Sequence, residues 1–65
     1  MMFDYINPAN RAGIFPEDLD RLVALTRTEF PGDEMMLELH VLRAVQAVER
    51  GDVTLQEVLR PRVAA

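Results

Sequence analysis

Few side chains in this sequence could perform acid–base chemistry or bind a metal. His40 is the only histidine, and the 65 residues contain no cysteine, serine or lysine. A transition-metal site needs several ligands, and the helical neighbours of His40 four residues away are Met36 and Ala44, which supply none. The sequence therefore predicts no metal site and no cofactor.

Catalysis by His40 as a general base would require a proton donor within about 3 Å and a pocket that excludes water. The hydroxyls have other expected roles, since Thr54 is placed to cap a helix and Thr26 faces a core. Asp33 and Glu34 lie at an expected helix start, where capping and the helix dipole account for them. Two small helices also cannot easily enclose a substrate-sized cavity of about 300 Å³. We therefore expect no enzyme and no small-molecule substrate, unless a pocket around His40 is lined by at least two further polar groups.

Length and composition limit the class of protein. Sixty-five residues form at most one domain, and the 49% hydrophobic content is too high for a disordered chain. The net charge of −4 argues against a nucleic-acid or anionic-membrane surface. All seven basic residues are arginines, which fits either GC-rich codon usage or fork-shaped donors for carboxylates at an interface. Because the sequence contains no secretory signal pattern and no stretch of roughly 18 apolar residues, we expect a cytoplasmic, bacterial protein.

The elements that would position these side chains are helices. Pro16 followed by acidic residues fits a helix start, and the apolar spacing predicts an amphipathic helix over about 16–30. Asp33 is a good N-cap and Gly51 a good C-terminal stop, which predicts a second helix over about 34–50. The short linker predicts a helical hairpin, with the two helices antiparallel or steeply crossed. The expected core-facing residues are Leu19, Leu22, Val23, Thr26 and Phe30 on the first helix and Leu37, Val41, Ala44, Val45 and Val48 on the second.

The second helix carries an additional apolar stripe on its opposite side. Met35, Leu39 and Leu42 are spaced i, i+4, i+7, and Met36 lies at the edge of this stripe. Two alternatives follow: the ends of the chain cover the stripe within one copy, or the stripe pairs with another copy or a larger protein. We expect the second, with Met35, Met36, Leu39 and Leu42 as interface residues.

The two ends of the chain are expected to be less regular. Residues 1–15 are expected to form an aromatic arm with one possible helical turn, with Asn7 as its N-cap and Gly13 as its stop. The arm either closes the core or docks into another protein. Thr54 and Glu57 form a capping box that predicts a short third helix over about 55–60, and residues 61–65 are expected to be a tail. The expected fold class is all-α, a small helical hairpin with an N-terminal aromatic arm and a short third helix.

The stretch Gly51 to Arg60, GDVTLQEVLR, resembles the helical tail of type II secretion and type IV pilus assembly ATPases, where a Gly-x-Thr-Thr-x-Glu-Glu-Val-Leu-Arg pattern recurs. Val53 and Gln56 depart from that pattern. The resemblance covers ten of 65 residues, and no Gly-rich loop followed by Lys accompanies it. A glycine stop followed by a capping box accounts for the shared residues, so the resemblance assigns neither a family nor a nucleotide-binding role.

Together these patterns predict a non-catalytic protein–protein interaction module, either a homodimer or an accessory subunit or adaptor of a larger complex. Its partner would be another protein or a second copy of itself, with no nucleic acid and no membrane. The alternative is a small DNA-binding regulator or antitoxin-like protein, since two helices joined by a Gly-containing turn can form a helix-turn-helix. Against this alternative, Asp33, Glu34 and Glu38 would repel phosphate at the start of the second helix. The arginines of the C-terminal half could form only a local basic patch (Arg43, Arg50, Arg60, Arg62).

Overall fold

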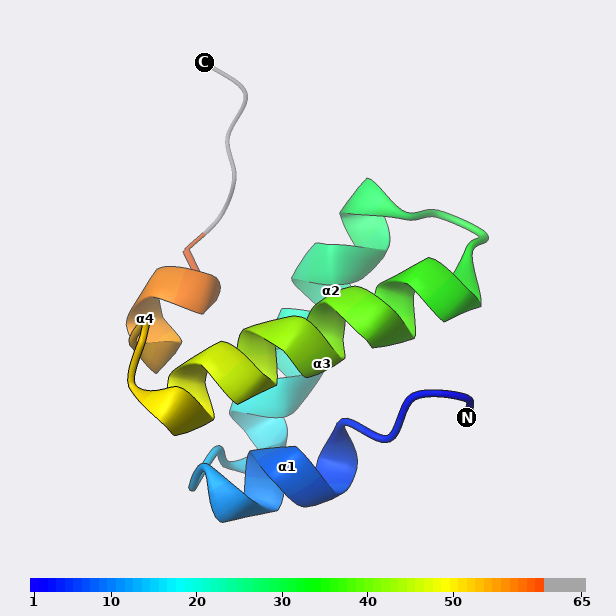
Figure 1. Ribbon diagram of the computed structural model, residues 1–65. Coiled ribbons are helices and arrows are strands. Elements are labelled where there is room, and N and C mark those ends of the chain that lie inside the picture. The colour runs from blue at the N-terminus through cyan, green and yellow to red at the C-terminus, as the bar shows by residue number, and fades with distance from the viewer. Residues whose placement is uncertain (61–65) are drawn as a thin grey trace.

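The computed structural model describes residues 1–60 and confirms the all-α class (Figure 1). Its described part contains four helices and no strand: α1 (Ile6–Arg11), α2 (Pro16–Glu29), α3 (Glu34–Arg50) and α4 (Leu55–Val58). The expected tail, residues 61–65, lies outside the described residues. None of the helices in residues 1–60 has the length and apolar character that crossing a bilayer requires.

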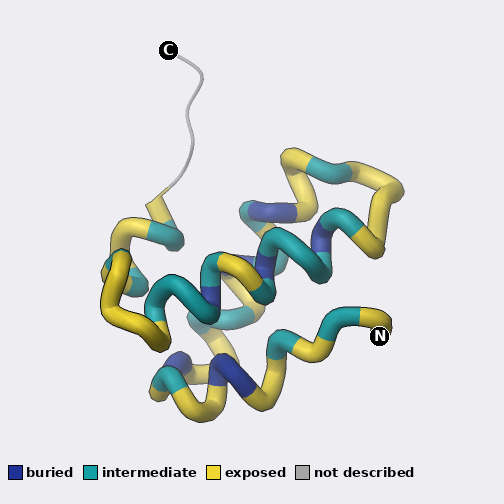
Figure 2. The backbone as a smooth tube through the Cα atoms, viewed as in Figure 1, coloured by how far each residue is buried: buried dark blue, intermediate teal, exposed yellow. Residues whose placement is uncertain are grey.

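Helix α3 is the central element, and its core-facing stripe is buried. Leu37, Val41 and Val45 lie on one side of α3 and are almost completely excluded from solvent. They pack with Leu22 of α2, while the neighbouring Thr26 is buried and donates its hydroxyl to the carbonyl of Leu22 over 2.8 Å. The 3.6-residue period of an α-helix puts such positions on one face, and Figure 2 shows the buried positions of α3 along the side that meets α2. Figure 1 shows α2 passing steeply behind α3.

Helix α1 lies beside α3 and runs in the same direction (Figure 1). Contacts at both ends of α3 fix this alignment. In the first half of α3, Glu38 accepts the backbone N–H groups of Met2 and Phe3. Near its end, Glu49 accepts from Arg11 over 2.9 Å. The N-terminal fifteen residues therefore contribute α1, which runs alongside α3, and the segment before α1.

The start of α1 corrects the expected N-cap. Asn7 lies inside the helix, and α1 begins one residue earlier, at Ile6. The capping acceptor is Asp4, whose Oδ1 accepts the N–H of Ile6 over 3.0 Å and that of Asn7 over 3.4 Å. Pro8 is tolerated at the third helical position because first-turn N–H groups have no intrahelical partner.

The side chains that the N-terminal segment buries are mainly aliphatic rather than aromatic. Ala9 is 1% exposed and Ile14 is also buried, and both belong to the core cluster. Phe15, the aromatic residue next to Ile14, is 68% exposed, while Tyr5 is partly buried against the core. A helix in close contact with α3 favours a small residue at the contact, which is why Ala9 occupies it.

Local capping sets the remaining helix ends. Asp33 accepts the N–H of Met36 over 3.1 Å at the start of α3, and Gly51 ends α3 with φ at 81°. Thr54 and Glu57 form both hydrogen bonds of a capping box at the start of α4. Helix α2 ends at Glu29 and α4 ends at Val58, one and two residues before the expected ends.

Candidate functional site

The second stripe of α3 lies on the side of the helix that no other described helix covers. Figure 1 shows α3 in front of α2, with α1 along one edge and α4 beyond its C-terminal end. Met35 is 52% exposed, and Leu39 and Leu42 are partly exposed. Met36, at the edge of the stripe, is also partly exposed. We call these four residues the α3 outer face.

The α3 outer face follows directly from the helical period. Each residue turns the helix by about 100°, so once Leu37, Val41 and Val45 point inward, Leu39 must point nearly the opposite way. None of the four outer-face residues belongs to the core cluster or to the partly buried apolar residues packed against it. The structure thus places the sequence-predicted interface residues together on one surface, outside the core.

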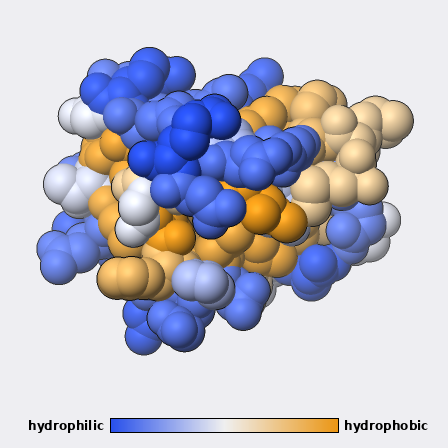
Figure 3. All heavy atoms as spheres, turned by 90° about the horizontal axis from the view of Figure 1, so that it is seen from below, coloured by the Kyte–Doolittle hydropathy of each residue, from blue (hydrophilic) through white to orange (hydrophobic). Residues whose placement is uncertain are grey.

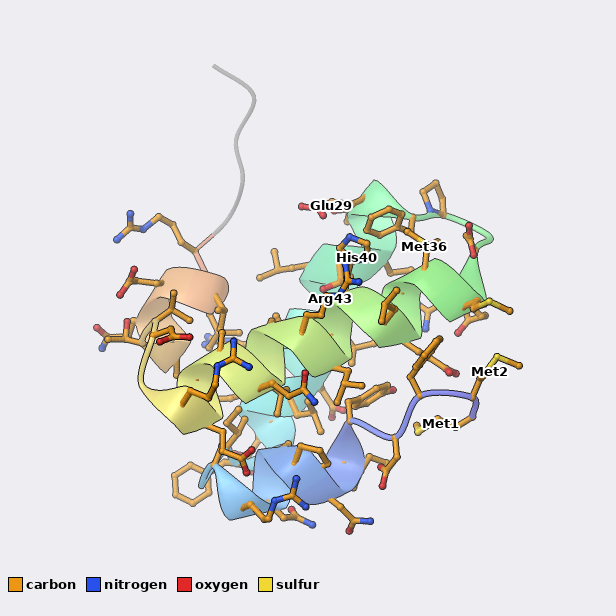
Figure 4. All side chains as sticks on the ribbon, in the orientation of Figure 1. Met1, Met2, Glu29, Met36, His40 and Arg43 are labelled. Atoms are coloured by element: carbon orange, nitrogen blue, oxygen red, sulfur yellow. The ribbon has the colours of Figure 1, made fainter. Side chains whose placement is uncertain are left out.

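The N-terminal residues extend this apolar surface along one edge of α3. Met1 and Met2 are 67% and 70% exposed. They lie beside the first half of α3, because Oε1 of Glu38 accepts the N–H of Met2 over 2.8 Å and that of Phe3 over 3.0 Å. Figure 4 shows Met1 and Met2 on the side of α3 opposite to Met36. In the view from below, apolar atoms also gather at the end of the molecule where the N-terminus lies (Figure 3). Sequence reasoning did not include Met1 and Met2, because only the fold brings them beside α3.

The hydrogen bonds from Phe3 and Met2 lower the pKa of the Glu38 carboxyl below its ordinary value. The backbone N–H of Phe3 has the largest effect, and the positive N-terminus adds to it. A carboxylate that accepts two N–H groups is stabilised in its charged form. Glu38 is therefore an ionised anchor that holds the N-terminal segment against α3.

The charged residues of α3 are nearly all engaged within the chain. Glu34 pairs with Arg27 across the α2–α3 turn, Glu49 pairs with Arg11, and Arg50 pairs with Asp52 over 3.0 Å. Arg43 is exposed and takes part in none of the ion pairs or hydrogen bonds within residues 1–60. Figure 4 shows Arg43 on the same side of α3 as Met36 and His40. A cation that is unpaired within the described chain therefore borders the α3 outer face. The residues in these pairs are Arg11, Arg27, Glu34, Glu49, Arg50 and Asp52.

His40 is held at the boundary between α3 and the end of α2. Its Nδ1 lies 2.9 Å from the carbonyl oxygen of Met36, and its ring centroid lies 4.3 Å from that of Phe30. Because a carbonyl oxygen only accepts, Nδ1 carries the proton of this hydrogen bond. The half-buried position agrees with the boundary histidine that its place on the helix indicates.

A cavity of about 200 Å³ adjoins His40, between α2, α3 and α4. Its lining includes the polar groups of Thr28, Glu29 and Arg60. A pocket around His40 with at least two further polar groups, which catalysis would require, is therefore present. The lining hydroxyls, however, donate to backbone carbonyls: Thr26 to Leu22 and Thr28 to Leu25 over 2.6 Å. No hydrogen bond joins His40 to a hydroxyl within the described chain. The geometry therefore pairs no nucleophile with a base among these residues.

Two other features of the described residues bear on chemistry: the spacing of metal-binding side chains and a second hollow. Within residues 1–60, no group of three His, Asp or Glu side chains is close enough together to hold a metal ion. A wider hollow of about 480 Å³ lies between α2 and α4, and its lining contains a single charged side chain. That lining consists of Arg21, Ala24, Leu25 and Leu59.

Comparisons with family models, with curated proteins and with solved structures give no match for this chain. The case for a function therefore depends on the exposures, contacts and charges of the described residues.

Proposed function

We propose that this protein is a non-catalytic protein–protein interaction module that binds through the α3 outer face. The observation that carries this proposal is the partial exposure of Met35, Leu39 and Leu42 at helical spacing on a side of α3 that no other described helix covers. Apolar residues gathered on one surface are typical of a site that another protein covers. In this proposal, α2 and α3 act as a hairpin that supports the surface, and the N-terminal arm borders it.

Covering the α3 outer face gives a favourable free energy that can be compared with the stability of so small a domain. Complete burial of one Leu or Met side chain contributes roughly 1.5–3 kcal/mol. Globular domains are stable by roughly 0.05–0.15 kcal/mol per residue, which for this length is about 3–10 kcal/mol. Because Met35 is about half exposed and Leu39 and Leu42 are already partly buried, covering these side chains yields only part of that value for each, which is less than the free energy of folding.

The residue types also suit a contact surface. Met35 and Met36 have unbranched, polarisable side chains that adapt to the shape of a partner, and Leu39, about one turn further along α3, provides a more rigid anchor. The partner is either a second copy of the chain or a larger protein to which this chain is an accessory subunit or adaptor. Both versions use the same four residues.

The test combines sedimentation equilibrium at micromolar concentration with site-specific photocrosslinking in cells that produce the protein. A photoreactive amino acid at position 39 should give a discrete adduct, of twice the chain mass for a homodimer or of mixed mass for a complex. The same group at the exposed Asp20 of α2 is the matched control. Leu39→Glu should abolish any self-association. A monomer of 7.4 kDa whose position 39 yields no adduct beyond that of position 20 would contradict the proposal.

A further inference from the structure

We infer that the α3 outer face selects an amphipathic helix of another protein, one that places a carboxylate opposite Arg43. This inference rests on the proposed function and names the chemistry of the partner. Three observations on residues 1–60 lead to it: the spacing of the apolar side chains, the engagement of every carboxylate of α3, and the unpaired guanidinium beside the apolar residues.

The spacing of the apolar side chains matches a helical partner. Met35, Leu39 and Leu42 follow one face of α3 over seven residues, which is roughly 10 Å of helix axis. Two turns of a facing helix cover that length with apolar side chains at i, i+4 and i+7. Such a helix contains all its own backbone hydrogen bonds, so it needs no polar acceptors from the α3 outer face.

The surface carries one cation without a partner in residues 1–60, although the chain as a whole is negative. Glu34, Glu38 and Glu49 are each bound by groups of their own chain, to Arg27, to the N–H groups of Met2 and Phe3, and to Arg11. Arg43 therefore presents the one charge of α3 that is not engaged within residues 1–60. Its fork of five donors fits a carboxylate in a two-pronged geometry. A partner helix with a glutamate or aspartate at this edge satisfies it.

Antiparallel pairing of α3 with the α3 of a second copy brings no carboxylate of that helix to Arg43. In a two-fold antiparallel pairing of α3 with itself, the same flank of each helix meets its counterpart. If Leu39 packs against Leu42 of the second copy, the two Arg43 residues share one flank, offset by five residues or roughly 7.5 Å along the axis. The two Glu38 residues share the other flank with the same offset. Like charges then meet on both sides of the apolar seam.

A parallel pairing does not remove this conflict. It brings the Arg43 flank of one copy against the Glu38 flank of the other, which would give an attractive pair. Glu38, however, already accepts two backbone N–H groups from the N-terminal segment, and its carboxylate is stabilised by them. Both N–H groups bind Oε1, so an arginine of a second copy would have to reach the remaining oxygen, Oε2, past the N-terminal segment that lies on this flank of α3. The charge pattern of this surface therefore favours a different protein over a second copy.

The test uses two fluorescent, covalently stapled helical peptides that share leucines at i, i+4 and i+7 and differ only in their flanking residues, all Glu or all Lys. Fluorescence anisotropy at 0.15 M salt, where charges beyond about 8 Å are largely screened, measures their affinity for the full chain. We expect the Glu peptide to bind about ten-fold more tightly than the Lys peptide. The net charge of −4 by itself favours the opposite order, so the expected result cannot come from overall charge.

Two variants with the same net charge locate the effect. Arg43→Glu should reverse the preference between the two peptides, whereas Arg21→Glu, on the exposed side of α2, should leave it unchanged. Leu39→Glu should weaken both peptides and so reports on the proposed function itself. Circular dichroism checks that each variant keeps its helix content.

Several outcomes overturn the inference. Equal affinity for both peptides, tighter binding of the Lys peptide, or no saturable binding up to roughly 1 mM each excludes selection of an acidic helix. A dimer in sedimentation that Leu39→Glu dissociates also overturns it, while the proposed function stands. If Leu39→Glu changes neither self-association nor peptide binding, the proposed function fails together with the inference.

Discussion

At the scale of single residues, the most consequential side chain outside the core is Glu38. Its carboxylate joins residues that are 35 and 36 positions apart in sequence, because Oε1 accepts the N–H groups of Phe3 and Met2. The apolar Met1 and Met2 are thereby held beside the α3 outer face. One titratable group thus ties the N-terminal end of the molecule to α3.

The lowered pKa of Glu38 predicts the pH at which this contact is lost. A carboxyl whose pKa in the folded protein lies below the unfolded value stabilises the fold above the unfolded value and loses that contribution as the pH falls through the folded one. The ordinary pKa of this group is 4.5. In NMR titrations, the amide resonances of Met2 and Phe3 should therefore shift together with a midpoint below 4.5. In Glu38→Gln this titration should disappear, and a midpoint at or above 4.5 in the native chain would count against the anchor.

At the scale of elements, each helix is defined by a local signal and stabilised by what it packs against. Helix α4 is the clearest case, since its four residues are too few to be stable alone. The capping box of Thr54 and Glu57 satisfies its first N–H groups, and Leu55, Val58 and Leu59 pack against the core. The cap and the packing together keep the short helix in place beside the end of α3.

Removal of the cap hydroxyl gives a test at this scale. Thr54→Ala removes the acceptor for the N–H of Glu57, whereas Thr54→Ser keeps a hydroxyl and serves as the control. We expect the Ala variant to lose about 1 kcal/mol of unfolding free energy, measured by urea denaturation followed by circular dichroism. The Ser variant should stay close to the native value. Equal stability of the two variants would mean that α4 opens independently of the rest of the domain.

At the scale of the whole molecule, the dimensions explain why α3 keeps an uncovered side. The principal extents are 29 × 28 × 20 Å, and a helix with its side chains is about 10 Å across. The shortest dimension therefore holds only two layers of helices. Helix α2 covers α3 from behind and α1 lies along its edge, so the described chain has no third layer for the front of α3 (Figure 1).

The small size of the core predicts that the N-terminal fifteen residues are needed for folding. Ala9 and Ile14 are two of the six apolar residues in the buried core cluster, and a core of this size supplies only about 3–5 kcal/mol. Deletion of residues 1–15 should therefore abolish the cooperative thermal transition seen by circular dichroism. Deletion of Met1 and Met2 alone, both largely exposed, should leave the transition nearly unchanged. A cooperative transition in the longer deletion would show that α2, α3 and α4 fold without α1.

Local signals in the amino-acid sequence were sufficient to predict the main helix ends and the two-sided character of α3. Pro16, Asp33, Gly51 and the Thr54–Glu57 capping box act within about four residues, and the helical period places Leu39 opposite Val41 and Leu37 in any fold. Short-range hydrogen bonds and geometry of this kind are visible in the sequence. The spacing of Met35, Leu39 and Leu42 was for this reason enough to predict the α3 outer face as the candidate site.

Contacts between distant segments, in contrast, set which residues cover α3 and which do not. The sequence left open whether the N-terminal arm closes the core or docks into another protein, and in the structure Ala9 and Ile14 are buried whereas Phe15 faces solvent. Likewise, nothing local indicates that Glu38 binds the N-terminus or that a cavity adjoins His40. These features join parts of the chain that are far apart in sequence, and their energies are set by packing rather than by local propensity. The side of α3 that remains open is therefore a property of the assembled helices.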